Sequence, residues 1–336
     1  MLGRIERESP VHAALAARAG GWSGLVIPDG FDAAADAAAD GPEQVEMLDL
    51  GGLDATLDTV ASISDLSAVV YLGHPEQPDP GLEEALLAGN QALICTAAAA
   101  VAPQWVWAGR PGAAGGAVVI DEVGLRDCAD VLRTLGVSPR VVPARTPVDE
   151  RIAIAGSSGS LVVEASRMPA TFTHLPGSDR LSALAPIWYG LIQACDAWPK
   201  FTTPAQVWLA FGPSDDRQGS LRESLGVFAD LGIDLQHVRS HPQEAGPHHF
   251  FTSFACPHVD AAEDLVAQLD ARGVAHRTLA VLLGSDFQPR PAALAPQWAP
   301  PLAPALTTDT PASAGSTFGS AFGSAFGGRA SDEARQ

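Results

Sequence analysis

The chain has 336 residues, of which 46% are hydrophobic and 18% are charged, so it is long enough for two or three compact domains with hydrophobic cores. Its 39 acidic and 20 basic side chains give a formal net charge of -19, which repels phosphate backbones and anionic lipid surfaces. Nucleic acid and membranes are therefore not expected as partners.

Single residue types exclude further classes of protein. The only lysine, Lys200, follows Trp198 and Pro199 rather than a glycine-rich loop, which argues against a Walker-type phosphate cradle and a Schiff-base lysine. The cysteines form no C-x-x-C pair, which predicts reduced thiols rather than disulfides or a zinc site. They are Cys95, Cys128, Cys195 and Cys256. Because no apolar run approaches the roughly 20 residues of a spanning helix, we expect a soluble, cytoplasmic protein.

In chain order, the first part alternates short apolar runs with helical-length segments rich in Ala, Leu and Asp. The apolar runs begin with "GLVIPDG", "QVEMLDL" and "SAVVYLG" and continue to "PRVVPART" and "SLVVEAS". Such alternation predicts βαβ units and a mostly parallel sheet, here in two lobes. We assign residues 1–21 to an N-terminal extension and residues 22–198 to the two-lobed region.

The pattern changes near Phe201, where the order becomes strand, helix, strand, strand, helix, strand. Gly219 and Gly232 bound the first helix, and the second runs from about His258 to Gly273. This order predicts a ferredoxin-like unit of the split βαβ type.

The end of the chain has a different composition. The segment "PRPAALAPQWAPPLAPAL" and the repeat "FGSAFGSAFGG" bury too little apolar surface to offset the entropy of ordering them. We therefore predict a ferredoxin-like domain over residues 201–286 and a disordered tail over residues 287–336.

Residues 205–285 resemble an ACT domain of the kind attached to prephenate dehydratases and aromatic amino-acid hydroxylases. The family's Gly-Ala-Leu and Glu-Ser-Arg-Pro motifs read Gly219-Ser220-Leu221 and Arg239-Ser240-His241-Pro242 here. The "HHFFTSF" run resembles the family's aromatic third strand. The resemblance implies that these seven residues line a site for an aromatic amino acid, with phenylalanine the first candidate, in a homodimer or tetramer. Backbone N–H groups at the start of the helix suit the ligand carboxylate.

The preceding part is similar to a prephenate dehydratase domain. "ALLAGNQALICTAAAAVAPQWVWAGRPG" resembles the family's crossover into its second lobe, and "GLRDCADVLRTLGVSPRVVPART" the helix and strand that follow. The implied fold is α/β: a two-lobed domain like periplasmic binding proteins, then a ferredoxin-like βαββαβ ACT domain. The implied function is phenylalanine biosynthesis by a carbon-oxygen lyase under allosteric regulation.

The catalytic motifs of that family are degraded in this chain. Dehydration of prephenate needs a proton donor for the leaving hydroxyl and groups that hold two carboxylates. The motif positions read Ile27-Pro28-Asp29-Gly30-Phe31, Gly73-His74-Pro75, Ile120-Asp121-Glu122-Val123 and Pro186-Ile187-Trp188. Relative to the family, these positions lack hydroxyl and amide donors. The carboxylates of Asp29, Asp121 and Glu122 would also repel a dianionic substrate. Because one missing acid costs on the order of 10²- to 10⁴-fold in rate, we expect little or no activity, as in a pseudoenzyme.

Two weak candidates for catalysis remain. Thr146 matches a polar position of the family, and His74 lies in a strand-end turn, where α/β sheets collect ligands. The alternative for His74 is a solvated turn histidine. Four further histidines lie along a strand or at a hairpin end, so they do not predict a metal site, and no cofactor is expected. They are His237, His241, His248 and His249.

Two other hypotheses stay open at this point. In one, the protein is a non-catalytic regulator that binds an aromatic amino acid through its ACT dimer and docks on a shikimate-pathway enzyme. In the other, it is a nicotinamide-dependent dehydrogenase, although no G-x-G-x-x-G fingerprint follows "GLVIP".

Overall fold

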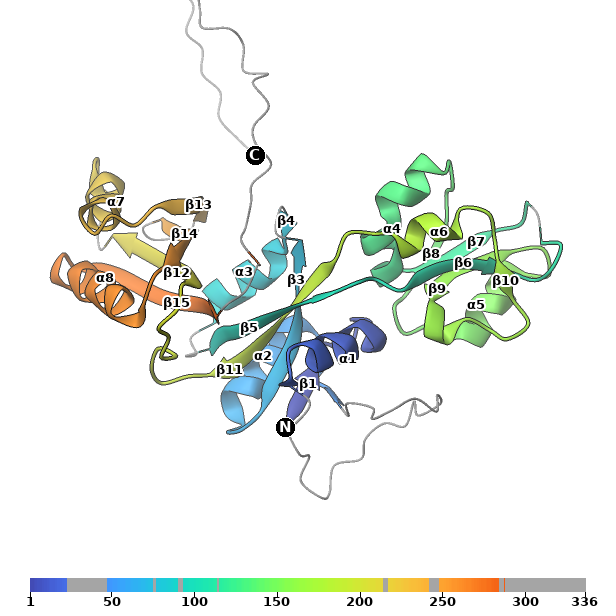
Figure 1. Cartoon of the computed structure of the whole chain (residues 1–336), viewed down its shortest axis with the longest axis horizontal. Helices are drawn as coiled ribbons and strands as arrows, with labels where there is room; N and C mark the ends of the chain where they lie inside the picture. The colour runs from blue at the N-terminus through green and yellow to red at the C-terminus, as the bar shows by residue number, and fades with distance from the viewer. Residues whose placement is uncertain are drawn as a thin grey trace, which may run out of the picture. The chain divides into compact units, whose positions relative to one another are not determined.

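The computed structural model describes residues 1–22, 47–74, 77–89, 93–113, 115–213, 217–241, 248–283 and 287 (Figure 1). Its α-helices are α1 (Pro10–Ala19), α2 (Leu53–Ser62), α3 (Pro80–Ala88), α4 (Glu122–Thr134), α5 (Val148–Ala155), α6 (Ser178–Ser182), α7 (Ser220–Asp230) and α8 (Val259–Ala271). A 3-10 helix, η2, spans Ala165–Arg167. The motif at residues 27–31, Pro75, Pro242 and the predicted tail beyond Phe287 lie outside the described residues.

The strands form two sheets, and both mix parallel with antiparallel pairs. In chain order the strands are β1 (Leu2–Arg4), β2 (Leu48–Asp49), β3 (Ser67–His74), β4 (Gln77–Pro78), β5 (Leu93–Val101), β6 (Trp105–Gly109), β7 (Val118–Asp121), β8 (Arg140–Val142), β9 (Ser160–Glu164), β10 (Thr173–His174), β11 (Ile187–Ala194), β12 (Ala205–Pro213), β13 (Leu235–His241), β14 (His249–Cys256) and β15 (Val274–Leu283).

The C-terminal region has the predicted strand and helix order. Its four strands lie in the order β13-β14-β12-β15, and neighbours are antiparallel. Helices α7 and α8 pack together against one side of this sheet (Figure 1). Gly232 and Gly273 follow the two helices with φ of 67°, the left-handed conformation in which glycine commonly terminates a helix. The ferredoxin-like prediction is confirmed for this region.

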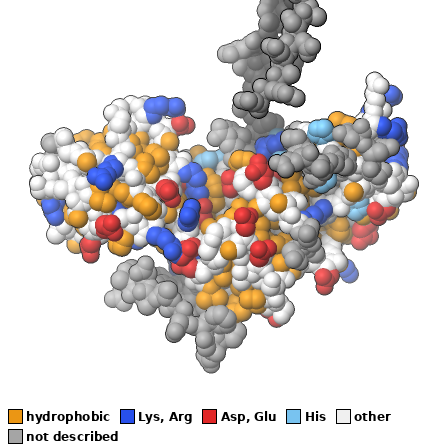
Figure 2. All heavy atoms as spheres, turned by 180° about the vertical axis from the view of Figure 1, so that it is seen from behind, with side chains coloured by type: hydrophobic (Ala, Val, Ile, Leu, Met, Phe, Trp, Pro, Cys, Tyr) orange, Lys and Arg blue, Asp and Glu red, His pale blue; other side chains and the backbone are white. Residues whose placement is uncertain are grey.

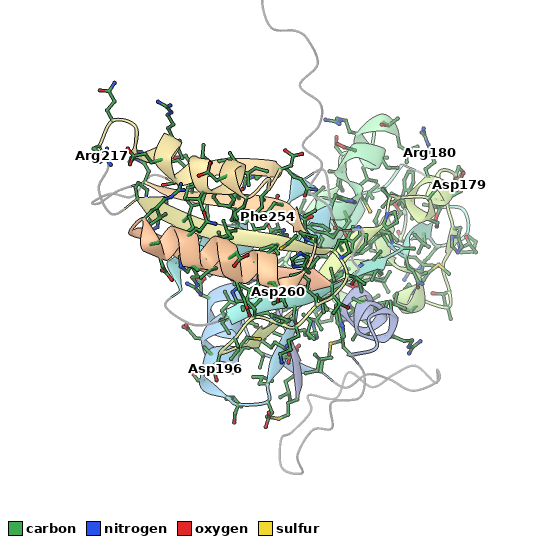
Figure 3. All side chains as sticks on the ribbon, turned by 60° about the vertical axis from the view of Figure 1, so that its left-hand side comes forward. Asp179, Arg180, Asp196, Arg217, Phe254 and Asp260 are labelled. Carbon is green, nitrogen blue, oxygen red and sulfur yellow. The ribbon has the colours of Figure 1, made fainter. Side chains whose placement is uncertain are left out.

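Aromatic side chains fill the layer between these helices and their sheet. Phe254 on β14 is fully buried, and it lies behind α8 in Figure 3. Its ring centroid is 5.9 Å from that of Phe228 on α7, which in turn is 5.5 Å from Phe211 on β12. The run "HHFFTSF" therefore supplies core residues to the domain.

The larger sheet continues from this region into the first lobe. β15 pairs in parallel with β5 at Ala280 and Cys95, and the order then runs β5-β11-β3-β1-β2. The sequence predicted a mostly parallel sheet, but β11 is antiparallel to both of its neighbours. Because β11 returns from the second lobe to the first, it must run opposite to β5, the strand that leaves the first lobe.

The first 21 residues belong to this sheet and are not an extension. β1 pairs with β2 and β3, and α1 packs against β3, β5 and β11. The side chain of Ser9 accepts a hydrogen bond from the His12 amide, and Pro10 opens the helix, which is a favourable helix start. Ala13 and Ala16 have no exposed surface. The charged run "MLGRIERESP" before this helix is typical of an exposed segment, so the sequence did not predict the buried helix.

The second lobe is a five-stranded sheet in the order β10-β6-β9-β7-β8. Its cores contain buried residues on both faces, including Trp105, Val106 and Ile120. Asp121 ends β7 and caps α4 through its side chain. All four cysteines are free, as predicted.

One predicted boundary and one compared motif fall inside the core. Ile187 and Trp188, which the sequence analysis aligned with a catalytic motif, begin β11, and Ile187 has no exposed surface. Phe287, the first residue of the predicted tail, is also fully buried. Its ring centroid lies 5.6 Å from that of Trp188 and 5.8 Å from that of Trp208. This phenylalanine, assigned to the tail from the sequence, is therefore part of the core.

The central position of β11 generates a test of the fold. A Cβ atom at Gly190 would lie 2.5 Å from Cys95 Sγ and 2.9 Å from Leu72 Cδ2, so Gly190→Ala overpacks the core and should lower the free energy of unfolding by about 1–3 kcal/mol. Urea denaturation measures this loss. The control Gly226→Ala lies in α7, where the nearest atom is 3.8 Å away. It should leave stability unchanged or raise it by up to about 1 kcal/mol, and equal losses in both variants would contradict the packing described.

Candidate functional site

The first half of the predicted ligand site lies at the start of α7. Gly219 precedes the helix with φ of 96°, a conformation that residues with a side chain rarely adopt. Ser220 is buried, and the Ser224 hydroxyl donates to its carbonyl oxygen at 3.1 Å. Leu221 packs against the domain core. The first turn of a helix leaves N–H groups without intrahelical partners, so this position suits an anionic group.

A cavity of about 500 Å³ adjoins this helix start. It is lined by Pro213, Arg217, Ser220, Glu223, Ser224, Gly226, Arg272, Gly273 and Val274. Arg217, at the edge of the domain in Figure 3, pairs with Glu223 through distances of 3.2 and 2.5 Å. Arg272 pairs with Asp230 at 2.7 Å. These exposed ion pairs contribute little to stability, so a ligand can exchange with them at small cost.

The second half of the predicted site contacts a carboxylate of the same chain. Arg239 Nη1 is 2.7 Å from Glu83 Oε2, and His241 Nε2 is 2.5 Å from Glu83 Oε1. Glu83 lies in α3, and only 4% of its side chain is exposed. Ser240 is exposed and Pro242 lies outside the described residues. Ser220 lines the cavity and Arg239 and His241 do not, so the structure places the predicted ligand residues in two groups.

The protonation of Glu83 depends on these two partners. Burial raises the pKa of its carboxyl group, while the hydrogen bond from His241 and the charge of Arg239 lower it. The neighbouring charge of Glu84 adds a smaller upward shift. A carboxylate taken out of water in this way stays charged only while its cationic partners remain in place.

The two catalytic candidates lie in different lobes, and Thr146 lies in a loop between β8 and α5. His74 is the last residue of β3, where its backbone pairs with Gln77 of β4. Thr146 is buried before α5, and its carbonyl oxygen accepts a hydrogen bond from Arg151 Nε at 2.7 Å. The structure therefore does not bring these two residues together, and the contact of Thr146 that it shows is made by the backbone.

Asp121 does not act as an uncompensated negative charge. Its Oδ1 accepts a hydrogen bond from the Gly124 amide at 2.7 Å, and its Oδ2 lies 2.7 Å from Arg151 Nη1. Both side chains of this ion pair are buried, whereas Glu122 is exposed. The expectation that Asp121 repels an anionic substrate is wrong, because Arg151 and the start of α4 compensate its charge.

A polar cluster joins the first lobe to the second, and sequence reasoning missed it. Arg126 on α4 donates from Nη1 to both carboxylate oxygens of Glu8, at 2.8 and 3.0 Å. Its Nε donates to Asp127 Oδ1 at 2.9 Å, and its Cζ lies 3.5 Å from the ring centroid of Tyr71. The last contact is a cation–π interaction. Together with His12, Trp105 and Tyr189, these residues are called the Arg126 cluster.

Asp127 is the buried centre of the Arg126 cluster. It accepts a hydrogen bond from Trp105 Nε1 at 3.0 Å and lies 4.0 Å from His12 Nδ1, and its side chain has no exposed surface. His12 Nε2 accepts a hydrogen bond from the Gln104 amide at 3.1 Å, so the neutral ring carries its proton on Nδ1 and faces Asp127. This arrangement fixes α1 against β6 and α4.

Burial keeps most groups of the Arg126 cluster in their neutral forms. It lowers the pKa of His12 to about 4 and raises the pKa of Tyr71 to about 12. Burial also raises the pKa of Glu8, against the charge of Arg126. Tyr189 is fully buried, and its hydroxyl has no hydrogen-bond partner among the residues that the structure describes. At neutral pH one guanidinium thus faces two acidic side chains.

The sequence carried no short signal for this cluster. Glu8 and Arg126 are 118 positions apart, and each stands in a charged segment that is typical of a solvated surface. The structure therefore brings a guanidinium and two tyrosine rings together at positions outside the motifs compared in the sequence. The prediction that donors are lost concerned the motif positions alone and did not consider these residues.

The solved structures that resemble this chain include two prephenate dehydratases and one acylase. A crystal structure of prephenate dehydratase in complex with L-Phe from Arthrobacter aurescens has a TM-score of 0.57 at 18% identity, and covers 75% of this chain and 85% of that one. The prephenate dehydratase of Staphylococcus aureus subsp. aureus Mu50 has a TM-score of 0.51 at 13% identity. The match covers 70% of this chain and 89% of that one. The chain has a prephenate dehydratase-like fold. The expected α/β architecture is thereby confirmed.

The third structure is GqqA, described as a novel type of quorum-quenching acylase, with a TM-score of 0.53 at 15% identity. It covers 86% of this chain and 100% of its own. No family model and no curated protein matches the chain.

The described residues contain no helix with the length and apolar character needed to cross a bilayer. Within the same ranges, no group of three His, Cys, Asp or Glu side chains is placed to hold a metal ion. His237 contacts the Phe251 ring edge-on and His241 contacts Glu83. On the face drawn in Figure 2, acidic and basic side chains are interspersed among hydrophobic ones.

The buried imidazole of His12 generates a pH prediction. Burial lowers its pKa to about 4 from 6.5, so the unfolded chain takes up a proton first and stability falls as pH drops below 6.5. Between pH 7 and pH 5 this residue should cost the protein about 2 kcal/mol. Urea unfolding at both pH values should show a correspondingly smaller acid loss in His12→Gln.

The exposed His174→Gln serves as control and should follow the wild-type pH dependence. If His12→Gln lost stability on acidification as steeply as the wild type, the buried neutral imidazole would be wrong.

Proposed function

We propose that this protein is a prephenate dehydratase-like protein of phenylalanine biosynthesis with little or no dehydratase activity, whose C-terminal domain senses an aromatic amino acid. The fold shared with two prephenate dehydratases supports the family context. One of those structures is described in complex with L-Phe, which supports an aromatic amino acid as the ligand here. The ferredoxin-like order of β12 to β15 supports a separate sensor domain.

The observation that carries the low activity is the state of Arg126. Prephenate bears two carboxylates, and a site that binds it needs uncompensated positive charge. Arg126 already contacts Glu8 and Asp127, so a carboxylate of the substrate would have to replace one of them. A second guanidinium, Arg151, is buried against Asp121. A dianion therefore meets guanidinium groups that already have acidic partners.

The sensor role rests on the C-terminal residues. The start of α7, at Gly219 and Ser220, offers backbone N–H groups, and β13 offers the guanidinium of Arg239 and the imidazole of His241. In a protein of net charge -19, such groups are the places where an amino-acid carboxylate is attracted. We extend the proposal to a homodimer or tetramer of this domain, with docking of the two-lobed region on a shikimate-pathway enzyme as the means of regulation.

An acylase function is less well supported. Acyl transfer by serine needs an accessible hydroxyl beside a base, and His174 Nδ1 lies 3.2 Å from Ser178 Oγ. However, Ser178 is 3% exposed, and its Oγ accepts a hydrogen bond from the Trp107 amide at 3.0 Å. This hydroxyl fixes β6 to α6, and it is not open to attack a substrate.

The proposal predicts the outcome of a turnover assay. Purified protein incubated with prephenate at neutral pH should form phenylpyruvate at least about 10²-fold more slowly than an active dehydratase, because positioned donors of this kind each contribute on the order of 10²-fold or more. The Staphylococcus aureus enzyme, assayed in parallel by absorbance of phenylpyruvate, is the positive control. Turnover at a comparable rate would contradict the loss of activity and support the family context.

Ligand binding gives a second prediction. Phenylalanine should release or absorb heat on titration into the wild type, with tyrosine and tryptophan as comparison ligands. Gly219→Val forces a branched residue into φ of 96°, which costs about 1–2 kcal/mol and shifts the start of α7, so the affinity should fall about tenfold.

Gly112→Val is the matched control, since Gly112 has φ of 82° and, like Gly219, no atom within 4 Å of an added Cβ. It lies in the second lobe and should leave the affinity unchanged. No heat with any of the three amino acids would remove the sensor function.

A further inference from the structure

The Arg239 and His241 pair already has an occupant, and this occupant comes from the first lobe. Glu83 lies in the first turn of α3, which begins at Pro80 with Asp79 as its cap. Each carboxylate oxygen of Glu83 has its own partner: Oε2 contacts Arg239 at 2.7 Å and Oε1 contacts His241 at 2.5 Å. The two partners can divide the two oxygens of a free carboxylate in the same way.

Exposure differs between the two sides of this contact. The side chain of Glu83 is 4% exposed, whereas those of Arg239 and His241 are 34% and 20% exposed. Solvent, and hence a dissolved carboxylate, can reach the cationic residues from outside. Glu83, by contrast, loses its hydration for this contact, and a carboxylate that gives up water needs strong partners to remain in place.

We propose that Glu83 is an internal competitor for the ligand carboxylate, so that an amino acid binds Arg239 and His241 by replacing Glu83 and thereby releases α3 from β13. This inference rests on the proposed sensor function and adds its regulation. The Glu83 side chain is tethered close to its partners and therefore has a high effective concentration. The apparent Kd of the ligand then equals its intrinsic Kd divided by the fraction of molecules in which Glu83 does not occupy the pair.

The contact of Glu83 with Arg239 and His241 is linked to the lobe junction by a hydrogen bond between α3 and β3. The Asp79 amide, at the start of α3, donates to the Leu72 carbonyl of β3 at 3.0 Å. The adjacent residue, Tyr71, carries the ring on which Arg126 lies. Release of the first turn of α3 therefore acts on the strand that supports the Arg126 cluster, which gives the ligand a physical route to the two-lobed region.

The test compares two neighbouring glutamates of α3. Glu83→Gln keeps the shape of the side chain and removes the competing charge, and Glu84→Gln removes an exposed charge one residue away. If Glu83 occupies the pair nine-tenths of the time, its loss should tighten phenylalanine binding about tenfold. Calorimetry with phenylalanine should therefore show the gain in Glu83→Gln alone, with Glu84→Gln equal to the wild type.

Hydrogen exchange provides the second readout in the same proteins. Phenylalanine should speed amide exchange in the first turn of α3 in the wild type, and ligand-free Glu83→Gln should already show the faster exchange. Phenylalaninamide, which lacks the carboxylate, should not speed this exchange in the wild type. Thermal melting checks that each variant is folded.

The outcomes separate the two proposals. Equal affinity in the wild type and Glu83→Gln would overturn the competition and leave the sensor function standing. Unchanged affinity in Arg239→Gln would also overturn it, because the ligand would then bind elsewhere, for example in the cavity beside α7. Absence of phenylalanine binding in every variant would overturn the sensor function and the competition together.

Discussion

A buried or half-buried guanidinium must be matched by carboxylates, because the loss of hydration of either ion alone costs several kcal/mol. This constraint recurs inside the second lobe and at contacts of the first lobe with the second lobe and with the C-terminal domain. Arg126 lies against Glu8 and Asp127, Arg151 against Asp121, and Arg239 against Glu83. With 39 acidic and 20 basic side chains, the chain has more carboxylates than cationic side chains to pair with them. The arrangement of charges therefore determines both how the parts are held together and what the sites can bind.

The same constraint explains why the junction is poorly suited to a dianion. Arg126 joins a segment before α1 to α4, so its partners also connect the two lobes, and the Ser9 hydroxyl adds a hydrogen bond to Glu164 at 3.0 Å. A substrate that took Glu8 from Arg126 would leave one buried carboxylate unpaired and break a link between lobes. An active dehydratase needs the opposite: positive charge that stays uncompensated until the substrate arrives.

The sequence predicted the C-terminal domain well because its signals are local. Gly232 and Gly273 terminate helices, and a nearly continuous apolar run from Ala205 marks a buried strand, so that these elements could be recognised within a few residues. The first 21 residues failed this test since charged side chains surround a buried alanine face. The contacts of Arg126 and Glu83 could not be predicted, because they join positions 118 and 156 apart that no motif relates.

Glu83 shows how a fold can turn this constraint into regulation. At Arg126 the carboxylates of Glu8 and Asp127 belong to different lobes, so exchange with a ligand would break a link between lobes. At Arg239 the carboxylate comes from the first turn of a helix, and its cationic partners remain reachable from solvent. Exchange there leaves Arg239 and His241 paired with a second carboxylate, while Glu83 must regain water or take up a proton. The ligand shifts this equilibrium only by the difference between its affinities for the two states.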